Sequence, residues 1–413
     1  MKPNQQIVIS HSGKQHSYHV AKSLNDLGYL NQFYTSSYIK HNRLQNYFLK
    51  KNNQFWTRRF LTGLAGKKVE ANWRFEIPEH LGKIFKYDSK KIEELVYSRD
   101  EKFDTYMSTI ISKTEPKYYW GFQGSCLKSI KAVKKYGGIS ICELATAHIT
   151  FAKLILNEEK QLHPEWADSI SNVDFPMHYE KRLVEEPNEA DIVIAASAFT
   201  KLSLTESEIP ENKIHILPLG ADVEHIKYLE KKQNKNKPLK LLYAGTVTQR
   251  KGIYYLLEAM KYFSKSEVEL HIIGNVFGSG LAFEKYKDVY TYHGSVSQQQ
   301  LFEMYQEFDV LVLPTIFEGF ALVIVEAMAA GLPVITTAHS IGPELINDDE
   351  NGYIVPIRNI EAIKRSIEKI VNKTAEEFEE MSKKARFSAL NYSWNKYKNR
   401  LEVFLEKINQ LNN

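Results

Sequence analysis

Short apolar runs that alternate with amphipathic helical stretches are the feature that most restricts how this chain can fold. Helical patterns occur, for example, at 253–263 and at 298–308, where Ser297 and Gln300 form a capping box before the helix. Since strands that alternate with helices form right-handed βαβ units, the sequence predicts a parallel sheet. The apolar runs of the second half are LKLLYAG (239–245), VELHIIG (268–274), VYTYHG (289–294), DVLVLP (309–314), PVITT (333–337) and GYIVP (352–356).

The first half shows the same alternation less regularly, at QIVIS (6–10), QFYTS (32–36), KYYW (117–120), ISICEL (139–144), DIVIAAS (191–197) and KIHILPLG (213–220). A chain of 413 residues is too long for one ordinary hydrophobic core, so two domains are expected. The polar, lysine-rich stretch that ends at Pro238 is typical of an exposed linker. We therefore predict two doubly wound α/β domains, 1–220 and 239–391, joined by a linker at 221–238. Ligands of such sheets bind beyond the carboxyl ends of the strands, which places the expected site in a cleft between the domains.

The composition excludes membrane-spanning and disulfide-rich classes. Hydrophobic residues make up 43% and charged residues 25% of the chain, as in ordinary soluble proteins. The apolar run at 7–9 is too short for a signal peptide, and no run approaches the roughly 20 residues of a membrane span. Cys126 and Cys142 have neither metal-ligand spacing nor the density of a disulfide framework. We expect a soluble protein in a reducing cytoplasm.

Two glutamates bracket the apolar segment that follows the strand at 309–314. Glu318 lies in the turn after this strand, and Glu326 lies in the second turn of a helix predicted at 321–330, which stops at Gly331. Carboxylates accept hydrogen bonds from vicinal hydroxyls, and free N–H groups at a helix start favour phosphate oxygens. The N–H groups in question belong to Phe320, Ala321, Leu322 and Val323. The pattern is typical of a site for an anionic, hydroxyl-rich ligand. The spacing alone is equally compatible with a purely structural role, in which Glu318 interacts favourably with the helix dipole and Glu326 lies on a solvated face.

The segment that begins Glu318-GFALVIV-Glu326 and continues AMAAGLPVI resembles the E-x7-E signature of retaining glycosyltransferases of family 4, which have the GT-B fold. The resemblance extends, in that family's order, to ADIVIAASAF (190–199), LPLGAD (217–222), LLYAGTVTQRKGIYYLLEA (241–259) and VYTYHGSVSQQQL (289–301). It covers nearly the whole chain. It implies an α/β protein of two Rossmann-like doubly wound domains that face each other across a cleft, with the acceptor in the first domain and the nucleotide sugar in the second.

The resemblance also implies roles for the residues around the two glutamates. Glu318 takes the place of a glutamate that contacts the donor sugar, and Glu326 that of a glutamate that binds the ribose hydroxyls. The backbone amides that hold the sugar and the diphosphate correspond to those of Phe320, Ala321 and Leu322. Many relatives have Gly-Phe-Gly where this chain has Gly-Phe-Ala, so the methyl group of Ala321 could bias the choice of sugar.

In GTVTQRKG (245–252), Lys251 matches a lysine that binds the diphosphate, although a Lys-Gly turn before a helix is by itself common. Thr246 follows Gly245 where the family often has arginine, and Arg250 could restore the missing charge. The chain has no D-x-D element of the kind that many metal-dependent transferases use. The resemblance therefore implies a metal-free site in which Lys251, Arg250 and a helix N-terminus stabilise the leaving diphosphate. No cofactor is expected, because the nucleotide-diphosphate sugar is a donor substrate.

Candidate residues in the first domain follow the strands at 6–10 and 139–144. Gly13 and Lys14 lie on a loop that lacks the phosphate-loop and dinucleotide patterns, and that in the family closes on the donor phosphates and the acceptor. His148 resembles a histidine that approaches the sugar and is expected on a loop that faces the cleft, although a lone loop histidine is more often a surface residue.

Two further groups of residues complete the candidates. Asn275 and Val296 follow strands at the place where the nucleobase would bind, mostly through backbone atoms. His11, His16 and His19 raise the question of a metal, but with no nearby carboxylate or cysteine in the sequence we predict none.

Residues 40–69 contain eight Lys or Arg and no Asp or Glu. Apolar side chains are interleaved with these cations, namely Phe48, Phe55, Trp56, Phe60 and Leu64. The pattern favours contact with an anionic membrane surface, although nucleic acid would use the same features and a solvated helical hairpin would share them. Because many members of the family act on lipid-linked acceptors, we favour a peripheral position at the inner face of the membrane over nucleic acid binding.

We predict a retaining, metal-independent hexosyltransferase. Its substrates would be a nucleotide-diphosphate sugar and a glycan or lipid-linked acceptor, in the biosynthesis of a cell-surface polysaccharide or glycolipid. The alternatives are a sugar-nucleotide epimerase or phosphorylase on the same fold, and a non-catalytic nucleotide-sugar-binding protein. A dehydrogenase is disfavoured because the dinucleotide fingerprint is missing. In the family the C-terminal helix, here within 392–413, crosses back onto the first domain, where Trp394 would anchor it; alternatively, it closes its own domain.

Overall fold

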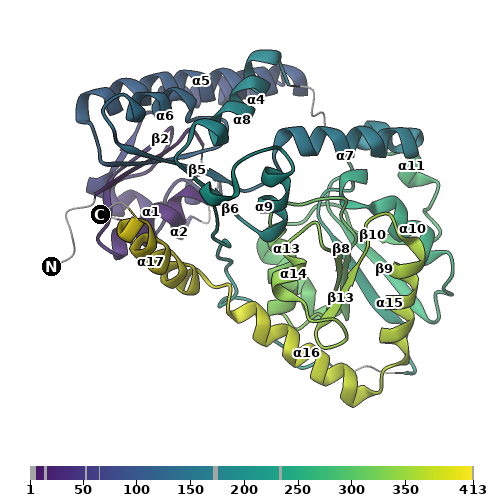
Figure 1. The fold of residues 1–413 in the computed structure, drawn as a ribbon. Helices are drawn as coiled ribbons and strands as arrows, with labels where there is room; N and C mark the ends of the chain where they lie inside the picture. The colour runs from purple at the N-terminus through teal and green to yellow at the C-terminus, as the bar shows by residue number, and fades with distance from the viewer. Residues whose placement is uncertain are drawn as a thin grey trace.

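Two parallel β-sheets, each flanked by helices, make up the molecule (Figure 1). The computed structural model describes residues 6–13, 16–51, 54–64, 66–170, 175–231 and 235–411. One sheet comes from the first half of the chain and the other from the second half. Within the described residues, no helix combines the length and the apolar character that a bilayer span requires.

The N-terminal sheet has seven parallel strands in the order β3-β2-β1-β4-β5-β6-β7. The strands are β1 (Ile7–His11), β2 (Leu30–Thr35), β3 (Val69–Ala71), β4 (Tyr118–Phe122), β5 (Ile139–Leu144), β6 (Ile192–Ala195) and β7 (Ile214–Ile216). The α-helices of this half are α1 (Ser17–Asp26), α2 (Asn42–Lys50), α3 (Gln54–Thr57), α4 (Ile77–Ile84), α5 (Ser89–Thr114), α6 (Leu127–Lys134), α7 (Ile149–Leu162), α8 (Met177–Glu189) and α9 (Ala198–Thr205). Short 3-10 helices are η1 (Gly66–Lys68), η2 (Trp73–Phe75), η3 (Pro164–Ser169) and η4 (Glu211–Lys213).

The C-terminal sheet has six parallel strands in the order β10-β9-β8-β11-β12-β13. The strands are β8 (Leu239–Ala244), β9 (Val268–Ile273), β10 (Thr291–Tyr292), β11 (Val310–Leu313), β12 (Val334–Thr337) and β13 (Gly352–Val355). The α-helices are α10 (Ile253–Met260), α11 (Leu281–Glu284), α12 (Gln298–Met304), α13 (Leu322–Ala329), α14 (Gly342–Leu345), α15 (Ile360–Asn372), α16 (Ala375–Leu390) and α17 (Trp394–Leu411). The 3-10 helices are η5 (Gln249–Lys251) and η6 (Tyr305–Glu307).

In each sheet, the strand order runs outward in two opposite directions from one point. This switch point lies between β1 and β4 in the N-terminal sheet and between β8 and β11 in the C-terminal sheet. The carboxyl ends of the strands at a switch point border a crevice that binds ligands in doubly wound folds. The predicted fold class, two Rossmann-like domains of parallel strands, is confirmed.

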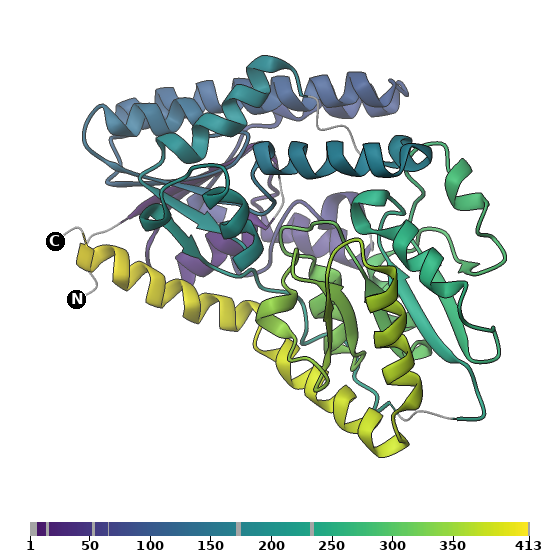
Figure 2. The same cartoon turned by 45° about the vertical axis from the view of Figure 1, so that its right-hand side comes forward.

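The two halves of the molecule share one apolar core through α7 and η3. Leu156 of α7 and Trp166 of η3 are buried in the same cluster as Leu256 and Phe283 of the C-terminal half. Figure 2 shows α7 lying across the top of the C-terminal domain, although its sequence precedes β6 of the other sheet. Because α7 contributes to both halves, it fixes how the two sheets face each other.

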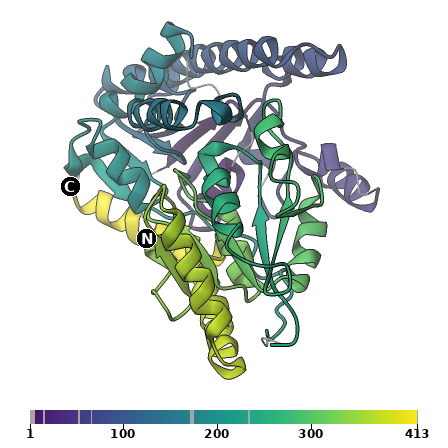
Figure 3. The ribbon, with the colours of Figure 1, turned by 90° about the vertical axis from the view of Figure 1, so that its right-hand side faces the viewer.

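Helix α17 leaves the C-terminal domain and packs on the N-terminal sheet (Figures 1 and 3). Tyr397, Leu401 and Leu405 of α17 are buried in the core cluster that surrounds β1 and β2. Trp394 stacks on His19 of α1, with 3.9 Å between ring centroids. The last helix therefore connects the end of the chain to its beginning.

The segment predicted as an exposed linker is partly buried. Val223 and Ile226 belong to the apolar core shared with the C-terminal sheet. The ammonium group of Lys231 donates hydrogen bonds to the carbonyl oxygens of Tyr305 and Gln306, at 3.1 and 2.7 Å. The composition was misleading because single apolar side chains and a hydrogen-bonded lysine anchor a segment that is polar on average.

The basic segment at 40–69 also differs from the expectation. Phe60 and Leu64 are buried in the core around β1 and β2, and Phe48 stacks on Trp56 at 5.1 Å, with both rings packed partly against that core. The segment ends in the short strand β3, which was not predicted because its three residues include a charged Glu70. Among the side chains of this segment that the structure describes, which do not include that of Phe55, the large apolar ones that are exposed are Leu44, Tyr47 and Leu49 of α2.

Candidate functional site

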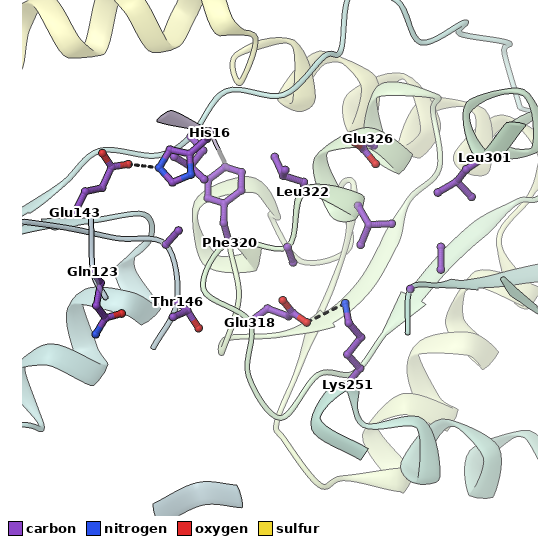
Figure 4. A pocket seen from close by; sticks show the side chains of 16 residues that line it. His16, Gln123, Glu143, Thr146, Lys251, Leu301, Glu318, Phe320, Leu322 and Glu326 are labelled. Atoms are coloured by element: carbon purple, nitrogen blue, oxygen red, sulfur yellow. Dashed lines mark hydrogen bonds and ion pairs between the residues drawn. The ribbon is translucent and has the colours of Figure 1, made fainter. Parts of the chain in front are cut away.

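A cavity of about 600 Å³, here called the cleft cavity, lies between the two sheets at their switch points (Figure 4). The N-terminal half contributes residues that follow β1 and β4 and that lie at and after the end of β5, among them His16, Gln123, Glu143 and Thr146. The C-terminal half contributes residues after β8 and β11 and on α13, namely Gly245, Lys251, Glu318, Phe320, Ala321, Leu322 and Glu326 among others. Residues that the sequence singled out, from Gly245 to Glu326, are thus brought together in one place.

Glu318 forms ion pairs with both cations of the 3-10 helix η5, Arg250 and Lys251. Its Oε1 lies 2.9 Å from Arg250 Nη1 and 2.9 Å from Lys251 Nζ. Burial alone would raise the pKa of the Glu318 carboxyl, but the two cations outweigh burial and hold that pKa below its usual value. Arg250 and Lys251 therefore point to the same place, and their combined charge exceeds that of the single carboxylate.

The turn that carries Lys251 is held by the N-terminal half. Glu159 of α7, which is fully buried, accepts hydrogen bonds from Gln249 Nε2 (2.6 Å) and from the Tyr255 hydroxyl (2.8 Å). Arg358 Nε pairs with the other carboxylate oxygen at 2.7 Å. Gly245 makes room for the lysine, because a Cβ at this position would lie 3.1 Å from Lys251 Nζ.

The start of α13 faces the cleft cavity. Ala321 adopts a left-handed backbone conformation with φ 62° and ψ 66°, which costs a residue with a Cβ about 1–2 kcal/mol. Helix α13 consequently begins at Leu322, one residue later than predicted. The first N–H groups of an α-helix have no intrahelical acceptor, so those of Leu322 and Val323 can bind an anion.

Glu326 lies at the far end of the cavity from His16 (Figure 4). Gln298 Nε2 donates a hydrogen bond to its Oε1 at 3.0 Å, and the Tyr305 hydroxyl donates to its Oε2 at 3.5 Å. Burial raises the pKa of the Glu326 carboxyl, and both hydrogen bonds oppose that rise. The two glutamates therefore occupy opposite electrostatic environments within one cavity.

The opposite wall contains a pair that the sequence did not indicate. His16 Nε2 lies 2.5 Å from Glu143 Oε1, and Trp120 Nε1–H donates to Glu143 Oε2 at 2.8 Å. The available signal was a glutamate at the end of an otherwise apolar strand, since Glu143 is the only charged residue of ISICEL. A charged side chain in a buried strand has to find a partner, and strand ends of this sheet border the cleft.

Several predicted residues are not among those that line the cleft cavity. Thr246 and Asn275 are exposed beyond β8 and β9, and Val296 packs partly against the C-terminal core. Gly13 is buried and donates its N–H to His11 Nδ1 at 2.7 Å. Lys14 lies outside the described residues.

His148 lies between β5 and α7, as expected, but it is not among the residues that line the cleft cavity. The residue is 1% exposed and is the N-cap of α7, where its Nδ1 accepts a hydrogen bond from Thr150 N at 3.3 Å. Burial lowers the pKa of His148 to about 4, so the ring is neutral near pH 7. Since Nδ1 accepts, Nε2 carries the proton. A catalytic role for His148 stays a prediction.

The three N-terminal histidines have separate partners. His11 accepts from Gly13, His16 pairs with Glu143, and His19 stacks on Trp394. Across the described part of the chain, no group of three or more His, Cys, Asp and Glu side chains is placed to hold a metal ion.

Comparison with known proteins gives a partial match. Residues 225–387 match the family model described as "Glycosyl transferases group 1". An "Uncharacterized 41.2 kDa protein in cps region" from Klebsiella pneumoniae is 33% identical over 174 residues, which cover 40% of this chain and 48% of that protein. The "Capsular polysaccharide biosynthesis glycosyltransferase CapM" from Staphylococcus aureus is 29% identical over 198 residues, which cover 44% and 52%. The chain spans about half the length of these relatives.

The fold has close structural counterparts. Sucrose-phosphate synthase from Thermosynechococcus elongatus superposes with a TM-score of 0.65 over 99% of this chain and 100% of that one, at 16% sequence identity. Similarity at this level of identity concerns the fold alone. Two parallel-stranded domains facing each other across a cleft are the GT-B arrangement that the sequence predicted.

Proposed function

We propose that this protein is a glycosyltransferase that moves a sugar from a nucleotide-diphosphate donor to a glycan or lipid-linked acceptor. The observation that carries the proposal is the cleft cavity itself, where Lys251, a helix start and a buried carboxylate face a polar wall of the other domain. Arg250 pairs with the same oxygen of Glu318 as Lys251 does. The match of residues 225–387 to glycosyl transferases supports it, because Lys251, Glu318 and Glu326 all lie in the matched range.

The donor would lie along the C-terminal wall of the cavity. Glu326 would accept hydrogen bonds from the ribose hydroxyls, and Lys251, Arg250 and the first amides of α13 would bind the diphosphate. Glu318 would contact the sugar. Because Glu318 pairs with both cations, the proposed donor would have to draw Arg250 and Lys251 from the carboxylate toward its diphosphate.

The proposed reaction breaks the bond between the anomeric carbon and the diphosphate oxygen, and the bonding electron pair leaves with the diphosphate. A bond forms between the acceptor oxygen and the anomeric carbon, and the hydroxyl proton passes to the departing phosphate oxygen. Lys251, Arg250 and the α13 amides stabilise the negative charge that develops on the diphosphate. Closure of the two domains over the donor would exclude water, which would otherwise hydrolyse the donor.

We propose that the anomeric configuration is retained. A double displacement needs a free carboxylate beside the anomeric carbon. Glu318 is held by two cations, and both oxygens of Glu143 are engaged by His16 and Trp120. Attack from the same side as the departing phosphate requires no such nucleophile. We also propose that the reaction needs no metal ion, since Lys251 and Arg250 supply positive charge.

We further propose a role in the synthesis of a cell-surface polysaccharide in the cytoplasm, at the inner face of the membrane. Similarity to a capsular polysaccharide glycosyltransferase supports the pathway class. The apolar side chains of Leu44, Tyr47 and Leu49 on α2 are each about half exposed, in a segment rich in cations. Binding to phosphatidylglycerol vesicles but not to phosphatidylcholine vesicles is expected, and a Tyr47→Glu variant should lose it. Equal binding to both vesicles would contradict the proposal.

Thermal stabilisation by nucleotide sugars tests the donor assignment. UDP-, GDP-, ADP- and CMP-sugars are added separately, and a donor at 100 times its dissociation constant should add about 2.7 kcal/mol to the free energy of unfolding. A Lys251→Ala variant should lose the stabilisation, whereas a Lys261→Ala variant, whose cation pairs with the nearby Glu258, should keep it. The donor assignment is wrong if none of the four classes shifts the melting temperature.

A further inference from the structure

The N-terminal wall of the cleft cavity contains polar side chains that have no role in the proposed binding of the donor. His16 and Glu143 lie at the end of the cavity opposite Glu326, with Phe320 between them and the donor residues (Figure 4). The Glu143 side chain is 1% exposed and that of His16 is 10% exposed, so the histidine is the member that reaches the cavity. Gln123 and Thr146 line the same wall.

The hydrogen bonds of Glu143 define what His16 can offer to a ligand. An ionised carboxylate only accepts hydrogen bonds, so its 2.5 Å contact with His16 Nε2 places the ring proton on that nitrogen. When the ring carries this proton alone, Nδ1 is an acceptor. Among the described residues, none hydrogen-bonds to His16 Nδ1. This nitrogen is therefore available to a hydroxyl donor in the cavity.

A second cavity, of about 530 Å³, adjoins this wall and shares Gln123, Ala145, Thr146 and Glu318 with the cleft cavity. Tyr97, Phe175 and Tyr179 line it, and their ring centroids lie 4.4 to 5.8 Å apart. We call it the aromatic cavity. Clustered aromatic rings offer flat apolar surfaces, on which the C–H face of a sugar ring can stack while its hydroxyls reach polar groups.

The charges of the described residues on this side disfavour an acidic ligand. Among the described residues of the N-terminal half that line the two cavities, none is Lys or Arg. Two cations of the C-terminal half line these cavities, Lys251 the cleft cavity and Arg250 the aromatic cavity, and both are paired with Glu318. A phosphate or carboxylate beside Glu143 would place two like charges in a poorly solvated space, which is unfavourable.

From these observations we propose that His16, held by Glu143, binds the attacking hydroxyl of a neutral glycan acceptor. The terminal sugar lies against His16, Gln123 and Thr146, and the next sugar residue occupies the aromatic cavity. This inference rests on the proposed function and deepens it by naming the acceptor class. His16 is an acceptor-binding residue, and Glu143 is a positioning residue that acts through it.

The test compares octyl glucoside with octyl glucuronide, which differ by a carboxylate at C6, as acceptors for the nucleotide sugar that stabilises the protein. At least tenfold higher kcat/KM is expected for octyl glucoside. His16→Ala should lower kcat/KM for octyl glucoside at least tenfold and leave the dissociation constant of the nucleoside diphosphate within twofold. His178→Ala, which removes an exposed histidine of α8, should change neither quantity.

Two further variants separate the parts of the proposal. Glu143→Gln should lower transfer with little change in nucleotide binding, and if this buried substitution prevents folding, His16→Ala decides alone. Tyr97→Ala should remove a preference for octyl maltoside, a disaccharide, over octyl glucoside. A preference for the glucuronide, or an unchanged kcat/KM in His16→Ala, would overturn the acceptor proposal.

These outcomes are distinct from a failure of the proposed function. Donor hydrolysis by water, measured without an acceptor, reports on the donor site alone. If the donor binds and is hydrolysed but His16→Ala transfers to octyl glucoside normally, only the acceptor assignment is wrong. If no nucleotide sugar binds or is consumed under any condition, both proposals are wrong.

Discussion

At the scale of single residues, Glu318 and Glu326 illustrate how one cavity gives two carboxylates opposite properties. Two cations lower the pKa of Glu318, whereas burial raises the pKa of Glu326. A carboxyl whose pKa is lowered by folding stabilises the fold above its unfolded pKa. A carboxyl whose pKa is raised by folding destabilises the fold over the same range. Substitution of the two glutamates should therefore change stability in opposite directions.

Glu318→Gln is expected to destabilise the free protein at pH 7 by about 1–3 kcal/mol, because Arg250 and Lys251 lose their counter-ion. The contribution of Glu318 is present above the usual glutamate pKa and is lost as the pH falls through its lowered pKa. The difference in melting temperature from the wild type should thus shrink below about pH 4. Glu361→Gln, which removes an exposed i,i+4 pair with Arg365, is the control and should have almost no effect. A Glu318→Gln variant as stable as the wild type at pH 7 would contradict this account.

Glu326→Gln is expected to stabilise the free protein at pH 7, because the amide removes the cost of a buried charge. A rise in melting temperature of about 1–2 °C is expected at pH 7. No rise is expected below about pH 4, where the wild-type glutamate is neutral like the glutamine of the variant. Affinity for the donor nucleotide should fall at least tenfold, measured by calorimetric titration. A gain in stability together with a loss of binding would mark Glu326 as a ligand-binding group. A loss of both would indicate a structural role instead.

At the scale of elements, the loop between β11 and α13 is in direct contact with the N-terminal half. Ser197 and Thr200 at the start of α9 donate hydrogen bonds to the carbonyl oxygen of Gly319, at 2.5 and 3.1 Å. A Cβ at Gly319 would lie 2.0 Å from the carbonyl oxygen of Ala145. The loop that carries Glu318 therefore meets the loop that follows β5, and only glycine fits between them.

Gly319→Ala is expected to separate these two loops. The variant should fold, because the clash lies between the domains and not inside either core. Its kcat/KM for transfer should fall at least tenfold, because a shift of about 1 Å between reacting groups can cost that much. Small-angle scattering should show a larger radius of gyration than that of the wild type. Ser197→Ala, which removes one hydrogen bond without a clash, should have a smaller effect. Unchanged transfer in Gly319→Ala would show that this contact does not matter.

Much of the fold could be predicted from the sequence because apolar runs of four to six residues are a strong local signal. The runs that became β8, β9 and β11 were predicted to within about two residues of their observed ends. The capping box of Ser297 and Gln300 at α12 is confirmed. Strand β3 was missed, since three residues with a central glutamate carry no such signal.

The two walls of the site differed in how well they could be predicted. Glu318, Lys251 and Glu326 lie close to one another along the chain of one domain and belong to a motif. His16 lies in the turn before α1 and Glu143 lies on β5. Because the two residues are far apart in the sequence, no local pattern indicates that they are in contact. His148 lies between β5 and α7 as predicted, but its role as a helix cap was not foreseen because it depends on where α7 begins.

At the scale of the whole molecule, the two domains are in contact on both sides of the cleft cavity. Glu159 of α7 connects Gln249, Tyr255 and Arg358 of the C-terminal half, and the apolar core continues through α7. Helix α17 forms a second connection on the other side, through Trp394 and His19. The cleft cavity is therefore a preformed space between two restrained walls, and its width is set by α7 and α17 together.

The central claim is that this cavity transfers a sugar with retention of configuration, and nuclear magnetic resonance of the reaction product tests it most directly. The nucleotide sugar that stabilises the protein is incubated with neutral octyl glycosides, and both products are followed in time. We predict one new glycosidic linkage with the anomeric configuration of the donor, formed in step with nucleoside diphosphate and absent in Lys251→Ala. A linkage of inverted configuration, or release of nucleoside diphosphate without any new glycoside, would contradict the claim.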